Sequence, residues 1–446
     1  TWVCFEAGVG GGGTWYVNRY PVCRFDSESY TYGYSFSQEL LQEWDWKEHY
    51  SAQPENERYL NYVADKVDLG KDSRRDSRVM SAVFDENENQ WEVLIEDGHR
   101  ARGQFLITSV GILSAGYVPE FEGKDTFKGF SCHTGRWPKE GVDLAGKRVG
   151  VIGTGASGVQ LITEIAKEVS HLTVFQRTAN FCAPLRNSLI DDETQKTIKS
   201  SYPEIFRKCM ETAGSFVHEF DPRSAMSVSP EERLEKYESL WQESGFKKWL
   251  SNFYDVMLPG EANEDYAEFF RNKIRERVND PDVAEMLVPK GHMFGSKRLP
   301  CESGYYEVYN QDNVLLVDVK SAPIERITPN GIKTKDAEYE LDVIIFATGF
   351  DAVTGSLSRL HIEGEGGQTL SDKFSNGPRT FMGVQSAGFP NLFTINQASV
   401  GNFVRAAEPL VDWVSEARAY VRDNNFSCMF ASEETEEDWT KHIAEA

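Results

Sequence analysis

A glycine-rich turn between an apolar strand and a helix constrains the fold more than any other stretch of this chain. Residues 147–152 (KRVGVI) predict a buried parallel strand, and the turn GTGASG follows directly at residues 153–158. Gly153, Gly155 and Gly158 then provide the tight turn, the close backbone approach and the close helix packing of a dinucleotide-binding unit. The helix that follows from Ser157 would present its first N–H groups to a pyrophosphate. A Rossmann-like βαβ unit is therefore expected here.

The next predicted strand, residues 172–175, decides which dinucleotide fits this unit. It ends in Gln176-Arg177-Thr178, and an arginine at this place suits a 2′-phosphate, whereas an acid would bond a free ribose hydroxyl. NADP(H) is therefore expected rather than NAD(H). A glycine-rich turn without a ligand is the weaker alternative, because strand, helix and second strand all flank the motif. The residues expected to hold NADP(H) are Gly153, Thr154, Gly155, Ala156, Ser157, Gly158, Gln160, Arg177 and Thr178.

The composition excludes several classes of function. The net charge of −23 argues against nucleic acid and anionic membranes as partners, since both require a basic face. No run of the sequence approaches the apolar length of a membrane span. The seven cysteines are odd in number and scattered, and no CxxC or HExxH motif points to a metal. We therefore expect a cytoplasmic globular protein with no metal site and no disulfide framework.

The segment FKGFSCHTGRWP, residues 127–138, carries the most specific motif in the chain. Periodicity gives it no meaning, and on the residues alone His133 and Trp137 are expected to be a partly buried linker pair. The segment nevertheless resembles the fingerprint FxGxxxHTxxWP of Baeyer–Villiger monooxygenases. The related N- and S-oxidising flavin monooxygenases carry a similar motif without this threonine and tryptophan. The matching residues are Phe127, Gly129, His133, Thr134, Trp137 and Pro138.

The N-terminal region resembles the flavin-binding part of the same family. Residues 2–6 (WVCFE) look like the second strand of another dinucleotide fold, whose glycine turn belongs about 20 residues earlier. The first βα unit is therefore expected to be missing from this sequence. The next stretch resembles GxWxxxxYPGxxxD through Gly13, Trp15, Tyr20, Pro21 and Asp26, with Val22 where the family usually has glycine. The alternative is a glycine-aromatic loop that packs on a sheet. The FAD contacts implied by the resemblance are Glu6, Gly13, Thr14, Trp15, Asp26, Tyr32 and Val79.

Two adjacent cations, Lys297 and Arg298, follow a Gly-Ser turn late in the chain. Charge pattern alone favours solvated side chains at such a place. The resemblance to the KR pair of the family implies instead that Lys297 helps to hold the 2′-phosphate and that Arg298 faces the flavin. It also implies that Asp26 pairs with Arg298 and orients it, so these two residues are the expected catalytic pair.

The remaining pattern predicts the other secondary structure. An amphipathic helix is expected at residues 53–67, a hairpin with an Asn-rich turn at 78–97, and a buried strand at 105–111. A capping box at Ser229 begins a helix whose apolar stripe includes Leu234. A further strand at 341–346, ending in the Ala-Thr-Gly of residues 347–349, is expected where the chain re-enters the FAD domain.

The fold class expected from all these signals is α/β, with two Rossmann-like dinucleotide-binding domains and a helical insertion. The FAD domain is expected to be discontinuous and to lack its first βα unit and its C-terminal tail. The expected segments are 1–113 (FAD domain), 114–181 (NADP domain), 182–290 (helical insertion), 291–340 (NADP domain) and 341–446 (FAD domain).

The resemblance covers the whole chain, is closest to the phenylacetone monooxygenase branch, and implies a function. NADPH reduces FAD, O2 forms a peroxyflavin, and one oxygen atom enters beside a ketone carbonyl to give an ester or lactone. Val22 and a changed loop at residues 396–402 keep open a heteroatom oxygenase or an NADPH oxidase, and the missing glycine turn keeps open an inactive partial chain that binds only NADP(H). The sequence leaves the ketone, the regiochemistry and the oligomeric state undetermined.

Overall fold

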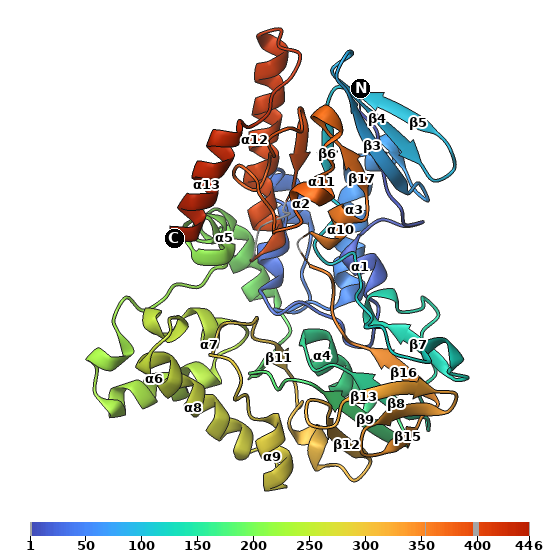
Figure 1. The fold of residues 1–446 in the computed structure, drawn as a ribbon. Coiled ribbons are helices and arrows are strands. Elements are labelled where there is room, and N and C mark those ends of the chain that lie inside the picture. Colours follow the sequence, from blue (N-terminus) through green and yellow to red (C-terminus); the bar gives the residue numbers. More distant parts are fainter. Residues whose placement is uncertain (1, 353, 396–400, 446) are drawn as a thin grey trace.

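The computed structural model describes residues 2–352, 354–395 and 401–445. A five-stranded parallel sheet in the order β12-β9-β8-β16-β7 forms its best-packed region (Figure 1). The motif helix α4 (Ala156–Ile165) and a small antiparallel sheet pack on this sheet through two separate apolar clusters. The parallel strands are β7 (Phe130–His133), β8 (Arg148–Ile152), β9 (His171–Gln176), β12 (Val314–Asp318) and β16 (Val343–Phe346). The antiparallel strands are β13 (Ile324–Thr328), β14 (Gly331–Thr334) and β15 (Glu338–Glu340).

Strand β16 corrects one expected boundary. It pairs in parallel with β8 and with β7, so it completes the sheet of the glycine-turn unit and does not open the last segment at residue 341. Its four residues are all buried, which is the pattern of a central parallel strand. The chain leaves this sheet only after Phe346.

The region assigned to the flavin holds three smaller sheets. The predicted hairpin is confirmed and extends to a four-stranded sheet, β17-β3-β4-β5. Two separate parallel pairs, β1-β2 and β6-β18, lie beside it. The strands are β1 (Cys4–Phe5), β2 (Ser73–Arg74), β3 (Val79–Asp85), β4 (Gln90–Ile95), β5 (Arg100–Gly103), β6 (Leu106–Thr108), β17 (His361–Glu363) and β18 (Leu392–Thr394).

The strand expected at 105–111 is shorter and less buried than the sequence implied. It spans three residues, and Ile107 is 44% exposed. Among the described residues β6 has a single partner strand, β18, so one edge of this apolar strand is unpaired. The helix expected at 53–67 is confirmed as α3. The helices of this region are α1 (Thr14–Val17), α2 (Gln38–Glu43), α3 (Gln53–Lys66), α10 (Gly355–Ser358), α11 (Leu370–Lys373), α12 (Phe403–Asp423) and α13 (Glu433–Glu445).

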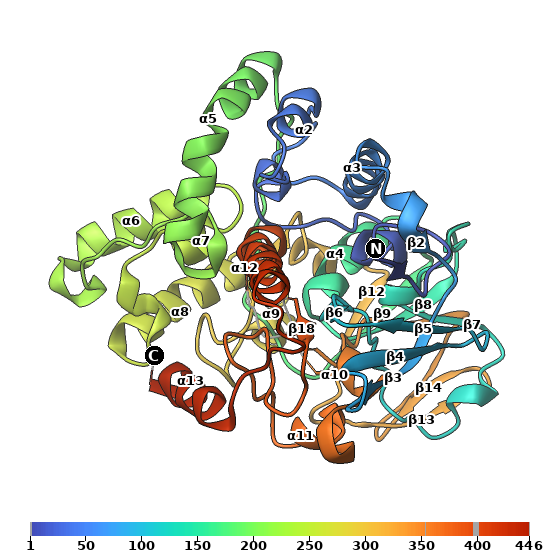
Figure 2. The same ribbon diagram turned by 90° about the horizontal axis from the view of Figure 1, so that it is seen from above.

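The helical insertion forms a lobe beside the five-stranded sheet (Figures 1 and 2). Its core is aromatic, with Tyr237, Trp241 and Phe270 among the buried side chains. Ser229 caps α6 as predicted, through the N–H of Glu232, but Leu234 is 53% exposed and lies off the buried stripe. The helices are α5 (Asp192–Glu211), α6 (Pro230–Gln242), α7 (Lys247–Leu250), α8 (Glu261–Arg275) and α9 (Pro281–Leu287).

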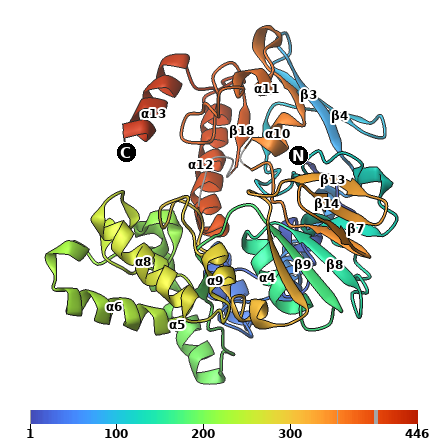
Figure 3. The same cartoon turned by 60° about the horizontal axis from the view of Figure 1, so that its bottom comes forward.

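Two pairs of chain segments tie these regions together. The insertion is entered and left through a short parallel pair, β10 (Ala183–Pro184) with β11 (Cys301–Glu302). The two connections between the flavin region and the five-stranded sheet run antiparallel, with Gly116 bridged to Phe350. Figure 3 shows α4 beside β9 and β8 of this sheet. Among the described residues, no helix combines the length and the apolarity that crossing a membrane requires.

Candidate active site

The GTGASG turn has the geometry of an anion-binding site. Gly153 adopts a φ of 108°, and a Cβ on Gly158 would lie 2.3 Å from the Gly153 carbonyl oxygen, so the helix can pack this closely only without a side chain. Gly155 is the N-cap of α4, no side-chain capping bond forms there among the described residues, and a Cβ added at Gly155 would meet nothing within 4 Å. The first turn of α4 therefore presents free donors to open space, as a pyrophosphate requires.

Arg177 and Lys297 supply positive charge without a protein partner. Both side chains are exposed, and within the part of the chain that the structure describes neither forms an ion pair or a hydrogen bond. The neighbouring Gln176 is buried instead and donates to the Met286 carbonyl at 2.7 Å. Thr154 Oγ1 donates to the Thr178 carbonyl at 3.2 Å, which links the glycine turn to the end of β9. Two unpaired cations in a chain of net charge −23 fit a 2′-phosphate.

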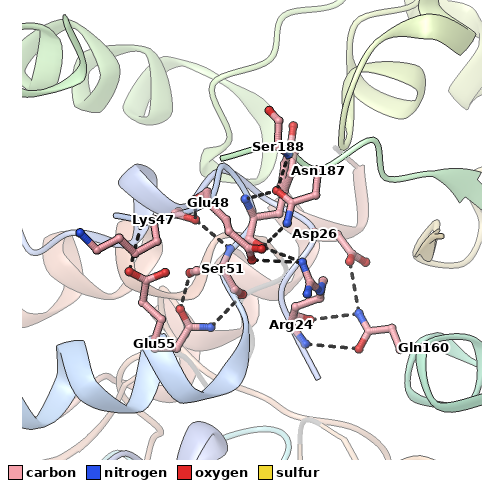
Figure 4. A network of polar contacts seen from close by, with 12 residues as sticks. Arg24, Asp26, Lys47, Glu48, Ser51, Glu55, Gln160, Asn187 and Ser188 are labelled. Atoms are coloured by element: carbon pink, nitrogen blue, oxygen red, sulfur yellow. Dashed lines mark hydrogen bonds and ion pairs between the residues drawn. The ribbon is translucent and has the colours of Figure 1, made fainter. Parts of the chain in front are cut away.

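Gln160, which is expected to contact a cofactor, has a side-chain amide that bonds to protein groups. Its buried amide oxygen accepts from Tyr20 Oη at 2.9 Å and from the Arg24 N–H at 3.4 Å. Its amide nitrogen donates to the Arg24 carbonyl at 3.1 Å and to Asp26 Oδ1 at 3.4 Å (Figure 4). Gln160, in the second turn of α4, therefore points to the loop that carries Asp26. Its hydrogen bonds join α4 to that loop.

Asp26 and Arg298 are brought together although 272 positions separate them. Arg298 Nη2 donates to Asp26 Oδ2 at 2.8 Å, and the Cys301 N–H donates to the same oxygen at 3.2 Å. The Asp26 carboxylate is fully buried, whereas the Arg298 side chain is 48% exposed and lies over the ring of Phe246 at 5.7 Å. Burial raises the pKa of Asp26, while the Arg298 guanidinium and the Cys301 amide act to lower it. The pair is therefore a buried anion that holds one end of a half-exposed cation.

The glycine-aromatic loop forms an aromatic wall beside an open turn. Gly13 has a φ of 50° and no atom within 4 Å of its Cβ position, and Thr14 is exposed. Trp15 is buried, and its Nε1 donates to Tyr32 Oη at 3.0 Å. The open backbone at residues 13 and 14 allows a flat cofactor to approach, and the buried aromatics support it.

Two other residues expected at the flavin lie at the rim of this region. Glu6 accepts from the Gly8 N–H at 2.6 Å and thereby orders the first glycine turn. Val79 is half-buried at the start of β3.

Val22, which stands where the family usually has glycine, has a strained backbone. Its φ is 55°, in the left-handed region that β-branched residues avoid. The strained turn immediately precedes the residues that Gln160 holds. The changed loop at 396–402 lies outside the described residues except for Gly401 and Asn402; Asn402 caps α12 and donates to Thr31 Oγ1 at 2.8 Å.

The fingerprint residue His133 fastens the two connections between the domains. Its Nε2 lies 2.9 Å from the Gly349 carbonyl oxygen, and its Nδ1 accepts from the Gly135 N–H at 3.0 Å. Gly349 also accepts from the Tyr117 N–H at 2.9 Å, so His133 joins the outgoing and the returning chain. Burial lowers the pKa of His133, which favours the neutral ring that this acceptor role of Nδ1 needs.

Packing accounts for the other fingerprint residues described below, with the exception of Thr134. Trp137 is buried in the core of the five-stranded sheet, and a Cβ on Gly129 would lie 2.3 Å from the Asp342 carbonyl oxygen. Phe127 is half-buried against the cluster under β13 and β14. Thr134 is fully buried, yet its Oγ1 has no hydrogen-bond partner among the described residues. A buried hydroxyl left unpaired next to His133 fits a bound cofactor as its partner.

No group of three or more His, Cys, Asp or Glu side chains in residues 2–352, 354–395 and 401–445 could hold a metal ion. The site residues that sequence reasoning did not identify are Arg24, Phe246 and Cys301.

Comparisons with known proteins agree with this geometry. A family model described as flavin-binding monooxygenase-like matches residues 4–186. A 2-oxo-Δ3-4,5,5-trimethylcyclopentenylacetyl-CoA monooxygenase of Pseudomonas putida is 46% identical, over 98% of this chain and 82% of the relative. A Baeyer–Villiger monooxygenase of Pseudooceanicola batsensis is 41% identical, over 96% of this chain and 79% of the relative. A crystal structure of OTEMO in complex with FAD and NADP matches with a TM-score of 0.96 and 46% identity, over 99% of this chain and 85% of that one. The chain therefore belongs to the Baeyer–Villiger monooxygenase family.

Proposed function

We propose that this protein is an NADPH- and FAD-dependent monooxygenase that inserts one oxygen atom from O2 beside a ketone carbonyl, giving an ester or lactone. The observation that carries the proposal is the pair of Asp26 and Arg298, a fixed cation that a buried carboxylate orients at the junction of the two dinucleotide regions. FAD, reduced by NADPH, supplies the activation of O2. The protein's own groups then bind the cofactors, orient the reacting groups and stabilise the developing charge.

Arg298 is suited to stabilise the negative charge that develops on oxygen during the insertion. An arginine stays protonated when it is partly desolvated, and a preorganised cation lowers the energy of a developing oxyanion. Asp26 holds one edge of the guanidinium at 2.8 Å, and Phe246 lies beneath its plane. The remaining N–H groups are left to face the substrate carbonyl oxygen. Arg298 is the catalytic residue in this proposal, and Asp26 orients it.

The unbonded N–H groups and the unpaired cations indicate where the cofactors make contact. The first turn of α4 binds the NADP(H) pyrophosphate, with Thr154, Ala156 and Ser157 flanking it, and Arg177 and Lys297 bind the 2′-phosphate. Thr178 lies beside them at the end of β9. On the flavin side Glu6, Gly13 and Thr14 contact FAD, Trp15 and Tyr32 support its ring system, and Val79 bounds the site from β3. The unpaired Thr134 hydroxyl donates to a cofactor oxygen.

The domain assignment is adjusted to the strand pairing. Residues 1–113 and the chain after Phe346 form the flavin region, residues 114–181 and 291–346 form the NADP region, and residues 182–290 form the insertion that covers the substrate side. The net charge of −23 argues against a nucleic-acid partner, and the seven scattered cysteines support a reducing cytoplasm as the location. Small ketones and O2 are its substrates.

The deciding experiment replaces Arg298 by alanine and compares it with Lys297→Ala, the adjacent cation. We expect Arg298→Ala to lower ester formation from a ketone by about 100-fold or more, while anaerobic bleaching of the bound flavin by NADPH remains measurable. Lys297→Ala should raise the KM for NADPH and spare the insertion step. Retained ester formation in Arg298→Ala would contradict the assignment. Parallel assays with a ketone and a sulfide separate Baeyer–Villiger from heteroatom oxidation.

A further inference from the structure

A buried ion pair joins the helical insertion to the loop that carries Asp26. His218 Nε2 lies 3.1 Å from Glu28 Oε1, and the two side chains are 3% and 5% exposed. Glu28 is two positions after Asp26, and His218 lies between α5 and α6 of the insertion. The second carboxylate oxygen, Glu28 Oε2, is buried and has no hydrogen-bond partner among the described residues. A protonated His218 therefore supplies the positive charge in contact with this carboxylate.

Tyr50 of the flavin region packs on the insertion beside this pair. Its hydroxyl oxygen lies 2.9 Å from Ser244 Oγ and 3.4 Å from Glu28 Oε1. Gly245 has a φ of 55°, and a Cβ on it would lie closer than 3 Å to the Tyr50 ring and hydroxyl, so the two segments can approach this closely only at a glycine. The backbone of the insertion is thus in direct contact with the flavin region at the residue before Phe246.

An aromatic contact leads from the His218 segment to Arg298. Phe216, two positions before His218, packs edge-on against Phe246, with 5.3 Å between the ring centroids and 79° between the ring planes. The guanidinium carbon of Arg298 in turn lies 5.7 Å from the centroid of the Phe246 ring. The position of His218 in the insertion is thereby coupled to the ring beneath the Arg298 guanidinium.

The same aromatic contact belongs to a cluster that also reaches Asp26. The buried members of this cluster include Phe246 of the insertion, Tyr50 of the flavin region and Cys301 of β11. The Cys301 N–H donates to Asp26 Oδ2 at 3.2 Å. Both Asp26 and Arg298 are therefore attached to one apolar cluster, which three parts of the chain share.

A buried ion pair adds little net stability, but it can fix the position of the elements that carry its charges. Removing two charges from water costs about as much free energy as their attraction supplies, so apolar side chains of similar volume often replace such a pair without loss. Apolar contacts are non-directional and tolerate small shifts of one element on another. Burial acts to raise the pKa of Glu28, but the charge and hydrogen bonding of His218 outweigh it, and the net shift is downward. The Glu28 carboxylate is therefore held in its ionised form.

We propose that Glu28 and His218 are positioning residues that set where the helical insertion sits on the flavin region, and so hold Phe246 beneath the Arg298 guanidinium. This inference rests on the role proposed for Arg298. Without the pair the insertion stays attached through its apolar contacts but is free to shift, so Arg298 is no longer held in one orientation.

The test replaces both charges in one chain, with Glu28→Met and His218→Leu. Because apolar side chains replace the whole pair, the unfolding temperature of the FAD- and NADP⁺-bound protein should stay within about 4 °C of the parent. The ester formed per NADPH consumed should nevertheless fall by about tenfold or more, with H2O2 formed from O2 in its place. Anaerobic bleaching of the bound flavin by NADPH should keep its rate. An unchanged ester yield in this double variant would overturn the proposal.

The matched control is a second buried ion pair, formed by Lys373 of α11 and Glu436 of α13, whose side chains are 10% and 4% exposed. Glu436 also accepts from the Ala387 N–H at 3.0 Å, and glutamine keeps that acceptor. Lys373→Met with Glu436→Gln therefore removes the charges of a similarly buried pair outside the insertion. The ester yield per NADPH should stay that of the parent.

Hydrogen exchange supplies a measurement that does not depend on turnover. We expect the amides of residues 244–250 to exchange faster in the Glu28→Met/His218→Leu variant than in the parent, and at the parent rate in the control. Parent-like exchange in the Glu28→Met/His218→Leu variant would overturn the inference, whereas a failure of the Arg298 assignment alone would leave the difference in exchange in place. If this double variant does not fold, Glu28→Gln with His218→Gln completes the same comparison, since it removes the charges and keeps the polar groups.

Discussion

The two glycine-rich turns of this molecule differ in what requires their glycines. At GTGASG the protein itself requires two of the three glycines, since a Cβ on Gly153 or Gly158 would lie 2.5 Å or less from a backbone oxygen. At the flavin-side turn Gly13 has a positive φ but no neighbouring atom, and the same loop keeps Val22 at a φ of 55°. The first turn is thus determined by packing of helix on strand, and Gly13 of the second by backbone conformation and by space left for a ligand. Substitutions should separate the two causes.

The largest effect is expected at Gly158. Gly158→Ala places a Cβ against the Gly153 carbonyl and should lower the free energy of unfolding by about 1–3 kcal/mol, with loss of NADP⁺ binding. Gly155→Ala is the matched control, because its Cβ meets open space and stability should change by less than about 0.5 kcal/mol. Thermal unfolding and NADP⁺ titration measure both quantities. If Gly155→Ala destabilised the protein as much as Gly158→Ala, the proposed division between packing and ligand approach would be wrong.

A smaller effect is expected at Arg177 and Lys297, the two cations proposed to contact the ligand and not the rest of the protein. Arg177→Ala and Lys297→Ala should each raise the KM for NADPH by about tenfold, since each charge-assisted bond contributes roughly 1.5–3 kcal/mol before solvent screening. The KM for NADH and the unfolding temperature should stay unchanged, because neither cation has an ion-pair or hydrogen-bond partner in the described part of the chain. Lys167→Ala, which removes an exposed cation paired with Glu164, is the control. Parallel loss of NADH and NADPH use would argue against a 2′-phosphate site.

The smallest effect is expected at Val22, with the opposite sign. Val22→Gly relieves a left-handed conformation that costs a β-branched residue about 1–2 kcal/mol. The greater freedom of glycine in the unfolded chain offsets about 0.4–1 kcal/mol of this gain in stability. The net result should be a gain of up to about 1 kcal/mol in chemical denaturation. Asp68→Gly, at a φ of 51°, should gain less because aspartate tolerates this region. A loss of stability in Val22→Gly would mean that the valine side chain packs usefully.

Local patterns predicted most of the secondary structure correctly. The helix α3, the hairpin β3–β4, the cap at Ser229 and the strand–turn–helix unit at β8 and α4 each depend on residues a few positions apart. The expectations that failed all depended on contacts with segments far away in the sequence. Leu234 and Ile107 are exposed although their patterns are apolar, and β16 belongs to the five-stranded sheet. Partner strands and covering elements decide these outcomes, and the local sequence of a strand or helix does not specify them.

The sequence by itself determined the glycine turn, the arginine at the end of β9 and the identity of the candidate pair Asp26 and Arg298. These follow from short-range sterics and from the chemistry of single side chains. The tertiary structure alone decided that Arg298 meets Asp26 and that the Gln160 amide bonds to the loop that carries Asp26. Their charge and hydrogen bonding take effect only within a few ångströms, and the folding of distant segments onto one another sets those distances.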